Sequence, residues 1–265
     1  MKDQDLNAVK EFHERTAEEY DKDYNTPYWR LYHEITWHNI KQFLPEGKSA
    51  VILDAGGGTG YWTIRLAKLG YRIVLTDIAE NMLKVAREKI RAADLQAKVE
   101  TRIVDIRDMS CFKSDYFDMA LAEGDPVSYC LDAEKAIKEL TRVVRPRAHV
   151  IVSVDSKYSF VPRLIAEKSF DKLSRLLRTG FLKGDFDFQA FTPEELKTLF
   201  ERSGLKVVRI IGKPVLTQFI PKEERNEIVE ENFRKLLKLE LRFCDTPSLV
   251  GLGGHLEIVG IKQRI

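Results

Sequence analysis

A glycine-rich turn placed between two acids is the part of this chain whose residue types and spacing best fit chemistry. An apolar run ends in Asp54, and glycines follow it at alternate positions: Gly56, Gly58 and Gly60. Glycine adopts backbone angles that other residues avoid and has no side chain to obstruct a ligand. A second acid, Asp77, ends the next apolar run, 23 residues after Asp54. An acid about 20 residues beyond such a turn can accept hydrogen bonds from a ribose, which predicts an adenosine-containing cofactor.

The spacing of the glycines decides between cofactors. A dinucleotide needs G-x-G-x-x-G, because its pyrophosphate sits at a helix N-terminus beside three placed glycines. This chain has G-x-G-x-G, with Tyr61 in place of the third glycine, and no Lys-Ser or Lys-Thr pair follows, as a P-loop requires. Asp54 would repel a pyrophosphate but suits a ligand with a cationic amine and no phosphate. S-adenosylmethionine meets both conditions. The alternative, a tight turn without a ligand, leaves two acids in register unexplained.

These segments resemble the class I S-adenosylmethionine-dependent methyltransferases. Residues 51–60 are similar to motif I, and residues 75–83 to the segment after it in the subgroup of ubiquinone/menaquinone-type and glycine-type small-molecule enzymes. The resemblance runs from about residue 15 to 154 and resumes at 191–211. It implies an enzyme with one methyltransferase domain over residues 1–265. The implied fold is α/β and Rossmann-like, a seven-stranded, mostly parallel sheet with helices on both faces and an antiparallel last strand.

The resemblance also implies which residues contact the cofactor. They follow the ends of successive strands: Asp54, Gly56, Gly58, Gly60, Asp77, Ile78, Asp105, Ile106, Glu123 and Gly124. Asp54 and the glycine backbone would hold the methionine part, and Asp77 the ribose hydroxyls. Asp105 resembles the family acid that accepts from the adenine amino group, with the two isoleucines as its apolar neighbours. The last two residues of the set fall where the family closes on the methionine end.

An aromatic, amphipathic segment precedes the first strand, and we expect residues 1–45 to form a lid over the cofactor. In related small-molecule enzymes such a segment covers this site. An aromatic face gains about 0.5–2 kcal/mol beside a sulfonium, and an arginine pairs with a carboxylate. Tyr20, Trp29 and Arg30 are therefore further candidate cofactor contacts. The alternative is a helix that its aromatic residues merely pack on the sheet.

The loop after the fourth predicted strand is expected to face the substrate. Amino-methyltransferases of DNA and protein glutamine carry an acid- or Asn-Pro-Pro-aromatic motif here. This chain has Asp125-Pro126 and then Val127-Ser128-Tyr129, which is one residue too long and lacks the second proline. That chemistry is therefore not transferred to this chain. The loop is more similar to that of the small-molecule enzymes, which makes Asp125 and Tyr129 candidate substrate contacts.

A general base is not assigned from the sequence. Methyl transfer from a sulfonium is an in-line displacement, so the protein mainly aligns the reactants and excludes water. A base helps when the acceptor loses a proton. Three histidines are candidates near the predicted pocket, although a lone histidine is more often structural: His33, His38 and His255.

Alternating apolar runs and helical periodicity predict a parallel sheet with crossover helices. The predicted strands are 50–54, 72–76, 99–104, 117–122, 148–154, 205–211 and 256–261. The predicted helices are 61–69, 80–92, 133–144, one opened by a capping box at Thr192 and Glu195, and one over 222–243. Pro146 is expected to stop the helix before the fifth strand.

Two stretches fall outside this alternation, at residues 155–190 and 213–250. Both leave the sheet at its carboxyl edge, where ligands bind in open parallel sheets. We expect them to form a substrate cap, and the aromatic residues of the first suggest a substrate with an apolar or aromatic part. The alternatives are added scaffold or a dimer face, so a homodimer stays open.

Composition narrows the function further. The net charge is +2, from 43 basic and 41 acidic residues, so no global field attracts nucleic acid. No apolar run reaches the roughly 20 residues of a membrane helix, and the polar N-terminus lacks a signal-peptide core, which predicts a cytoplasmic protein. The three cysteines are far apart and suggest neither disulfide nor zinc. No His/Asp/Glu group has metal-ligand spacing, so no metal is expected.

The predicted function is methyl transfer to O, N or C of a small molecule. An RNA or protein methyltransferase is the first alternative, and it would use the basic residues of 157–183 as a binding surface. A non-catalytic S-adenosylmethionine-binding regulator or partner subunit is the second, because it would carry the same glycine motif.

Overall fold

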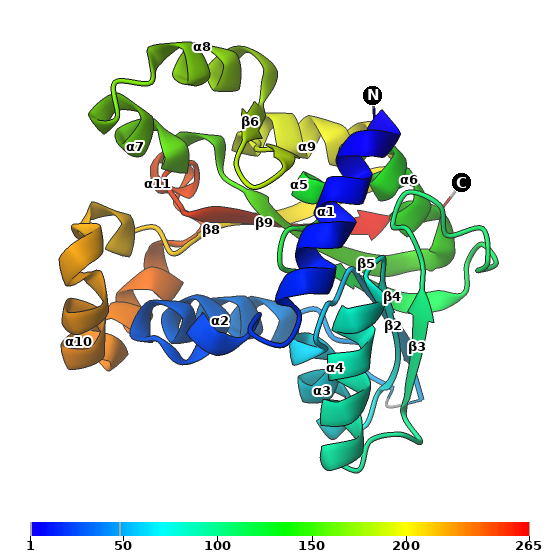
Figure 1. Cartoon of the computed structure of the whole chain (residues 1–265). Coiled ribbons are helices and arrows are strands. Elements are labelled where there is room, and N and C mark those ends of the chain that lie inside the picture. Colours follow the sequence, from blue (N-terminus) through cyan, green and yellow to red (C-terminus); the bar gives the residue numbers. More distant parts are fainter. Residues whose placement is uncertain (1, 48, 265) are drawn as a thin grey trace.

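The sheet at the centre of the molecule has seven strands in the order β3-β2-β1-β4-β5-β9-β8. The computed structural model describes residues 2–47 and 49–264. The first five strands pair in parallel, and β9 is antiparallel to both β5 and β8 (Figure 1). The strands are β1 (Val51–Ala55), β2 (Arg72–Asp77), β3 (Val99–Ile103), β4 (Phe117–Ala122), β5 (Val144–Asp155), β8 (Leu205–Lys213) and β9 (His255–Lys262). This arrangement confirms the predicted Rossmann-like fold class.

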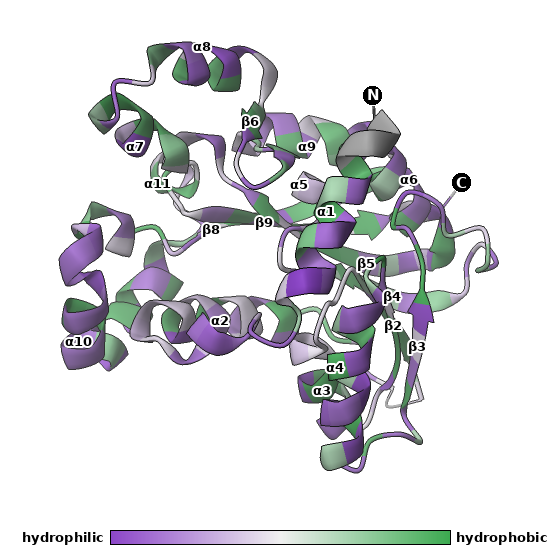
Figure 2. Cartoon of the chain, viewed as in Figure 1, coloured by the Kyte–Doolittle hydropathy of each residue, from purple (hydrophilic) through white to green (hydrophobic). Residues whose placement is uncertain are grey.

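Helices cover both faces of the sheet because successive strand residues point to opposite faces. On one face, Ile52 and Leu75 pack in a buried cluster with residues of α2, α3 and α4. On the other face, Leu53 and Val74 pack with residues of α6 and α9. The helices are α2 (Pro27–Lys41), α3 (Tyr61–Lys68), α4 (Glu80–Ala92), α6 (Ala133–Val143) and α9 (Pro193–Arg202). The central strands are largely hydrophobic, whereas the edge strand β3 is largely hydrophilic (Figure 2).

Most predicted elements are confirmed to within a residue or two, but the start of β5 differs. The helix before it ends at Val143, and β5 begins at once, so Pro146 lies within the strand instead of stopping a helix. The pairing of β4 with β5 shifts register between Phe117 and Met119. Such an irregularity accommodates a proline, which cannot donate a ladder hydrogen bond. The predicted capping box of Thr192 and Glu195 is confirmed.

The N-terminal segment is helical and lies across the carboxyl edge of the sheet. It consists of α1 (Lys2–Thr16), a short 3-10 helix η1 (Lys22–Asn25) and α2. α1 crosses in front of the sheet and meets the first turns of α4 (Figure 1). α2 packs lengthwise against α10 (Lys222–Phe243) through Leu31, Ile35 and Val229.

The two stretches outside the sheet have different surroundings. Residues 155–190 form η2 (Lys157–Phe160), α7 (Val161–Ala166), α8 (Phe170–Thr179) and a hairpin of β6 (Phe181–Lys183) and β7 (Asp187–Gln189). Residues 213–250 form η3 (Thr217–Phe219), α10 and α11 (Pro247–Val250). The hairpin reaches α1, whereas α10 lies beside α2. Among the described residues, no helix is long and apolar enough to cross a membrane.

Candidate active site

The glycine turn joins β1 to α3 in a conformation that requires glycine. Its three motif glycines have positive φ values: 67° at Gly56, 55° at Gly58 and 80° at Gly60. Gly57 needs glycine for another reason, since a Cβ there would lie 2.5 Å from Asp54 Cγ. The N–H of Gly58 donates to Asp77 Oδ2 at 3.0 Å. This bond ties the turn to the end of the neighbouring strand β2.

Asp54 lies beneath the turn, not on the side open to a ligand. Its side chain is fully buried and accepts a 2.6 Å hydrogen bond from Thr63 Oγ1 of α3. Burial raises the pKa of Asp54 to about 6, and the Thr63 hydroxyl opposes that rise. Two cavities, described below, make up the site, and Asp54 lines neither of them. One carboxylate oxygen therefore braces the turn against α3, whereas Oδ1 has no hydrogen-bond partner among the described residues. That Asp54 meets a cationic amine stays a prediction. Gly60 is likewise outside both cavities, as the N-cap of α3.

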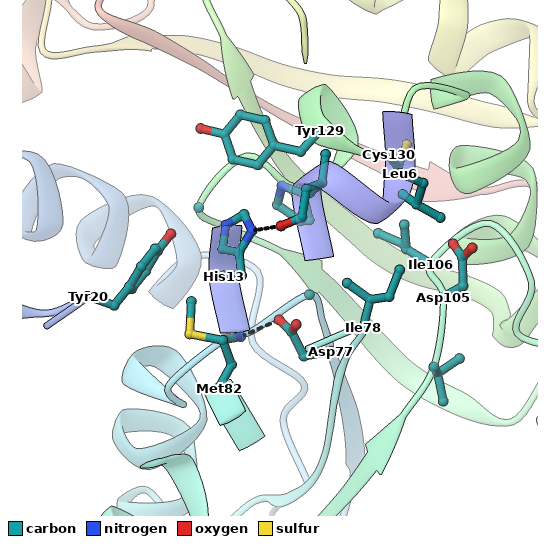
Figure 3. Close-up of a pocket in the computed structure, with 16 residues that line it drawn as sticks. Leu6, His13, Tyr20, Asp77, Ile78, Met82, Asp105, Ile106, Tyr129 and Cys130 are labelled. Atoms are coloured by element: carbon teal, nitrogen blue, oxygen red, sulfur yellow. Dashed lines mark hydrogen bonds between the residues drawn. The ribbon is translucent and has the colours of Figure 1, made fainter. Parts of the chain in front are cut away.

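The first of these cavities, here called the inner cavity, lies at the carboxyl edge of β1, β2 and β3 under α1 (Figure 3). Most of the predicted cofactor contacts line it: Tyr20, Gly56, Gly58, Asp77, Ile78, Asp105, Ile106 and Gly124. It is completed by residues that the sequence reasoning did not name as cofactor contacts: Leu6, Val9, His13, Met82, Val104, Pro126 and Cys130, with Tyr129 from the predicted substrate loop.

Asp77 is held on the wall of the inner cavity by two backbone N–H groups. Its Oδ1 accepts from the N–H of Ala79 at 2.9 Å, and its Oδ2 accepts from Gly58. Burial raises the pKa of Asp77, and these backbone donors and the nearby His13 counter that rise. Each carboxylate oxygen accepts more than one hydrogen bond. Asp77 therefore keeps acceptor capacity for two hydroxyl groups while the backbone fixes its direction.

Asp105 stands at the other end of the inner cavity, with Ile78 and Ile106 between the two acids (Figure 3). Arg107 grips its carboxylate, with Nη2 at 2.7 Å from Oδ2. The cavity thus offers hydrogen-bond acceptors at both ends of an apolar slot. Adenosine fits this set, because it has hydroxyl donors at the ribose, a flat ring and an amino donor on the base.

α1 closes the inner cavity, and the structure shows how the helix is held there. Leu6, Val9 and His13 face the cavity at spacings of three and four residues, a helical pattern that the sequence reasoning overlooked. Glu14 accepts from the N–H groups of Glu80 and Asn81, each at 2.8 Å. α4 has no cap from its own N-cap residue, so a carboxylate of α1 caps it.

The second cavity, here called the aromatic cavity, opens on the other side of the glycine turn. Its aromatic walls come from η1, α2, α3 and adjacent loops: Tyr20, Tyr24, Trp29, Tyr32, Tyr61, Trp62 and Tyr129. Glu123, Gly124, Asp125 and His255 close its far end. The two cavities share part of their lining, namely Tyr20, Gly56, Gly58, Gly124 and Tyr129. They therefore meet at the glycine turn.

The three aromatic-segment candidates separate in the structure. Tyr20 lines both cavities and Trp29 lines the aromatic cavity. Arg30 is exposed on the opposite side of α2, where it pairs with Glu230 at 3.0 Å and stacks on Phe233 of α10. The prediction that Arg30 contacts the cofactor is therefore wrong, because one step along a helix turns neighbouring side chains about 100° apart.

Glu123 belongs to a buried ionic triad instead of pointing freely into a ligand site. Lys213 Nζ lies 2.6 Å from Glu123 Oε2 and also pairs with Glu257, and all three side chains are 0% exposed. Asn39 of α2 donates to Glu257 as well. Lys213 further lies over the Tyr32 ring, 4.8 Å from its centroid. The triad ties β4, β8 and β9 to α2 behind the aromatic cavity.

Asp125, His255 and Asp155 form a second charged group, here called the His255 cluster. His255 Nδ1 lies 2.8 Å from Asp125 Oδ2. The ligand atoms of all three lie within 4.8 Å of one another, a separation that could hold a metal ion. The sequence showed no such spacing because the residues come from three separate segments. The expectation that the protein holds no metal stays a prediction. Nδ1 and Oδ2 are at the distance of an ion pair.

Ser153 of β5 fixes the loop that carries Asp125. Its hydroxyl accepts from the N–H of Gly124 at 3.0 Å and of Asp125 at 3.1 Å, and donates to Asp125 Oδ1 at 2.8 Å. Asp125 has a φ of 65°, a left-handed conformation that is uncommon outside glycine. The loop leads directly into α5 (Pro126–Tyr129), which places Tyr129 between the two cavities.

The other two candidate bases, His33 and His38, do not combine a place in a cavity with a carboxylate partner. His33 lines the aromatic cavity, but burial lowers its pKa to about 3, with Lys213 and Arg65 adding to the effect. It stacks on Tyr61 at 4.3 Å between ring centroids. His38 is exposed on α2 and lines neither cavity. Of the three histidines, His255 alone combines a cavity position with a carboxylate partner.

Comparison with known proteins gives consistent matches. A family model described as "Methyltransferase domain" matches residues 52–147. The chain is 20% identical over 246 residues, 91% of its length and 92% of the relative's, to tRNA 5-carboxymethoxyuridine methyltransferase of Escherichia coli. It is 32% identical over 119 residues, under half of either protein (42% and 43%), to a ubiquinone/menaquinone biosynthesis C-methyltransferase of Vibrio vulnificus.

Among solved structures, a Thermotoga maritima SAM-dependent methyltransferase, described as a possible histamine N-methyltransferase, superposes with a TM-score of 0.61 at 20% identity. The match covers 94% of this chain and 98% of that one. The fold is therefore shared over nearly the whole length. The Escherichia coli relative conflicts with the expectation that a nucleic acid is not a partner.

Proposed function

The chain belongs to the class I S-adenosylmethionine-dependent methyltransferases, and on that premise we propose that it methylates an O, N or C atom of a small molecule held in the aromatic cavity. S-adenosylmethionine is its cofactor and, when bound, supplies a methyl group already activated by the positive sulfonium. The residues of the chain then have to hold the two reactants in line and keep water away.

The observation that carries this proposal is the wall shared by the two cavities. Tyr20, Gly56, Gly58, Gly124 and Tyr129 line both of them. The inner cavity would hold the adenosine part, with Asp77 at the ribose and Asp105 at the adenine amino group. The reacting end would then lie at the junction, facing the aromatic cavity. Such a junction favours an in-line displacement between the two compartments.

α1 and the β6–β7 hairpin support a role as covers of this junction. Phe186 of the hairpin contacts Phe12 and His13 of α1, with ring centroids 5.2 and 5.8 Å apart. It also contacts Tyr129 at 5.2 Å. We therefore propose that residues 155–190 act as a cap through this hairpin and that α1 acts as a lid. Residues 213–250 meet α2 instead and would support the cavity wall from outside.

A nucleoside within tRNA is the second candidate acceptor. The similarity to the Escherichia coli tRNA enzyme over nearly the whole chain favours it. The placement of the acceptor end favours a small molecule, because Tyr129 lies between His13 of α1 and Phe186 of the hairpin. A base flipped out of a tRNA loop would have to pass these segments to reach the junction.

Two measurements test the proposal. Calorimetry should show binding of S-adenosylhomocysteine and no binding of NAD. The protein should then transfer labelled methyl from S-adenosylmethionine to a component of a metabolite extract that passes a small-pore filter. Label recovered only in purified tRNA would establish the second candidate, and absence of binding to S-adenosylhomocysteine would overturn the placement of the cofactor.

A further inference from the structure

We propose that the methyl acceptor is an amine that enters the aromatic cavity as an ammonium ion, and that the His255 cluster takes the proton this ammonium must lose. The inference rests on the proposed function and specifies its substrate class. It follows from three features of the aromatic cavity: the sign of its charges, the state of its tyrosines and the connection of His255 to the outside.

The charged groups of the aromatic cavity are predominantly acidic. Asp23, Glu123 and Asp125 line it, and its described lining contains no lysine or arginine. The nearest buried cation, Lys213, is held behind the wall between two glutamates. A carboxylate or phosphate acceptor would therefore find acids and no free cation. An ammonium would find the carboxylates of Asp23 and Asp125 in the lining, and opposite charges attract.

Burial and the nearby acids also raise the pKa values of two tyrosines in the wall of the aromatic cavity. Burial, followed by the charges of Asp125 and Asp77, raises the pKa of Tyr20 to about 12. Burial and the charges of Asp155 and Asp125 also raise the pKa of Tyr129. A hydroxyl acceptor that had to become an alkoxide or phenolate here would meet the same two costs. A cation instead gains from the acids and from the faces of the surrounding aromatic rings.

The His255 cluster is placed to accept a proton from such a ligand. His255 lines the aromatic cavity, and its ring contacts Trp29 and Tyr32 with centroids 5.9 and 5.1 Å away. Asp125 holds Nδ1, which leaves Nε2 as the acceptor once Nδ1 carries the hydrogen. Asp125 and Asp155 raise the pKa of His255 against the effects of burial and of Lys213. His255 is therefore a stronger base than an isolated histidine.

A path for the proton leads away from the acceptor. His255 and Asp155 both line a third depression, here called the outer groove. Tyr28, Gln218 and Arg225 line it as well. Asp155 is 8% exposed, and its Oδ2 has no hydrogen-bond partner among the described residues. Burial and the Asp125 charge raise the pKa of Asp155 to about 7. This carboxyl group therefore stands between His255, its partner across the β5–β9 ladder, and the outer groove, where it can pass a proton to water.

The reaction then balances in two steps. The bound ammonium, R-NH3+, gives one proton to His255 Nε2, and the proton leaves to water through Asp155. The nitrogen lone pair of R-NH2 forms the new N–CH3 bond while the S–CH3 bond breaks and its electron pair stays on sulfur. The products are R-NH2CH3+ and neutral S-adenosylhomocysteine.

Matched acceptors test the charge requirement. Trios of an amine, an alcohol and a carboxylic acid on one aromatic or aliphatic frame, such as 2-phenylethylamine, 2-phenylethanol and phenylacetate, are incubated with the full chain and methyl-labelled S-adenosylmethionine. We expect label only in amine members. Label in alcohols or acids but not in amines overturns the inference and leaves the proposed function standing. Label in no acceptor of any trio or of a metabolite extract, despite S-adenosylhomocysteine binding, overturns both.

Variants test the proton path on the best amine. His255→Gln should lower kcat by at least about 100-fold, the usual range for general-base catalysis, with a smaller change in KM, and should remove the acid limb of the kcat–pH profile. Asp155→Asn should lower kcat less and shift that limb. Glu134→Gln, an exposed acid on α6, is the control and should match the wild type. S-adenosylhomocysteine affinity checks that each variant is folded. An unchanged pH profile in both folded variants, or loss of activity on adding EDTA, overturns the role of the cluster.

Discussion

The inner and aromatic cavities sit on either side of one glycine turn but use charge in opposite ways. In the inner cavity each acid is satisfied locally, Asp77 by two backbone N–H groups and Asp105 by Arg107. In the aromatic cavity the acids are buried in groups, around Lys213 and around His255. The first arrangement presents directed hydrogen-bond acceptors to a neutral group such as adenosine. The second favours ligands of positive charge over ligands of negative charge.

The two cavities should also differ in how strongly their acids affect the stability of the fold. An acid satisfied by backbone N–H groups or by one adjacent arginine adds little strain to its surroundings, because its charge is compensated by its immediate neighbours. A buried ionic group is stable only as long as every member is present. Substitutions around the aromatic cavity should therefore mainly lower the free energy of unfolding. Substitutions in the inner cavity should mainly weaken cofactor binding.

The largest expected effect is on the aromatic side. Lys213→Met leaves Glu123 and Glu257 facing each other without a cation, and loss of one partner of a buried pair costs about 3–5 kcal/mol. The free energy of unfolding in urea should fall by that amount at neutral pH. Lys206→Met, an exposed position on the same strand, is the control. Adding Glu123→Gln and Glu257→Gln should recover part of the loss, and a fall below about 1 kcal/mol would show that the triad is not ionic.

On the inner side, Asp77→Ala should weaken S-adenosylhomocysteine binding by about 1–3 kcal/mol, because a charged acceptor is lost. The change in unfolding free energy should be smaller than for Lys213→Met. Calorimetry and urea denaturation on the same sample measure both. Asp77→Asn keeps the size of the side chain and should retain more of the affinity. Unchanged affinity in a folded Asp77→Ala protein would remove Asp77 from the ribose site.

The lid connects the two sides, and its expected effect is intermediate. Glu14→Ala removes the cap of α4 and should cost about 1 kcal/mol, a typical value for a lost helix cap. Hydrogen exchange of α1 and of the first turn of α4 should rise together, and S-adenosylhomocysteine should dissociate faster. Glu11→Ala, exposed on the same helix, should change neither. Faster exchange confined to α1 would argue against the cap.

The smallest effect is expected at Arg30, which belongs to neither cavity. Its pair with Glu230 is exposed, and such pairs contribute about 0–1 kcal/mol. Arg30→Ala should leave S-adenosylhomocysteine affinity unchanged in calorimetry and lower stability only slightly. Trp29→Ala, one residue earlier, is the informative partner and should reduce turnover. A clear loss of cofactor affinity in Arg30→Ala would contradict the position of α2.

The inner cavity was largely predictable because its residues are local in sequence. Asp77, Ile78 and Asp105 each directly follow a strand run, and parallel strands end at one edge of the sheet. The burial of Asp54 beneath the turn was not predictable, because the pattern does not tell which side of the turn a strand-end acid faces. Arg30 was misplaced because η1 and the start of α2 set the phase of the helix.

The aromatic cavity was harder to predict, for a physical reason. Lys213 and Glu257 meet only because β8 and β9 pair in one register, and Glu123 joins them from β4. Likewise, Asp155 and His255 face each other across the β5–β9 ladder. No short-range signal marks such a contact. His255 could be named as a candidate base, but its two acidic partners could not.

The single hydroxyl of Ser153 has a consequence for how acceptor specificity could diversify on this scaffold. A non-glycine residue in the left-handed region costs about 1–3 kcal/mol, and the three hydrogen bonds of Ser153 hold Asp125 there. The residues beyond that clamp, above all Tyr129, carry no such constraint. Evolution or a library screen could exchange them freely to accommodate new acceptors, whereas Ser153 and Asp125 would have to change together.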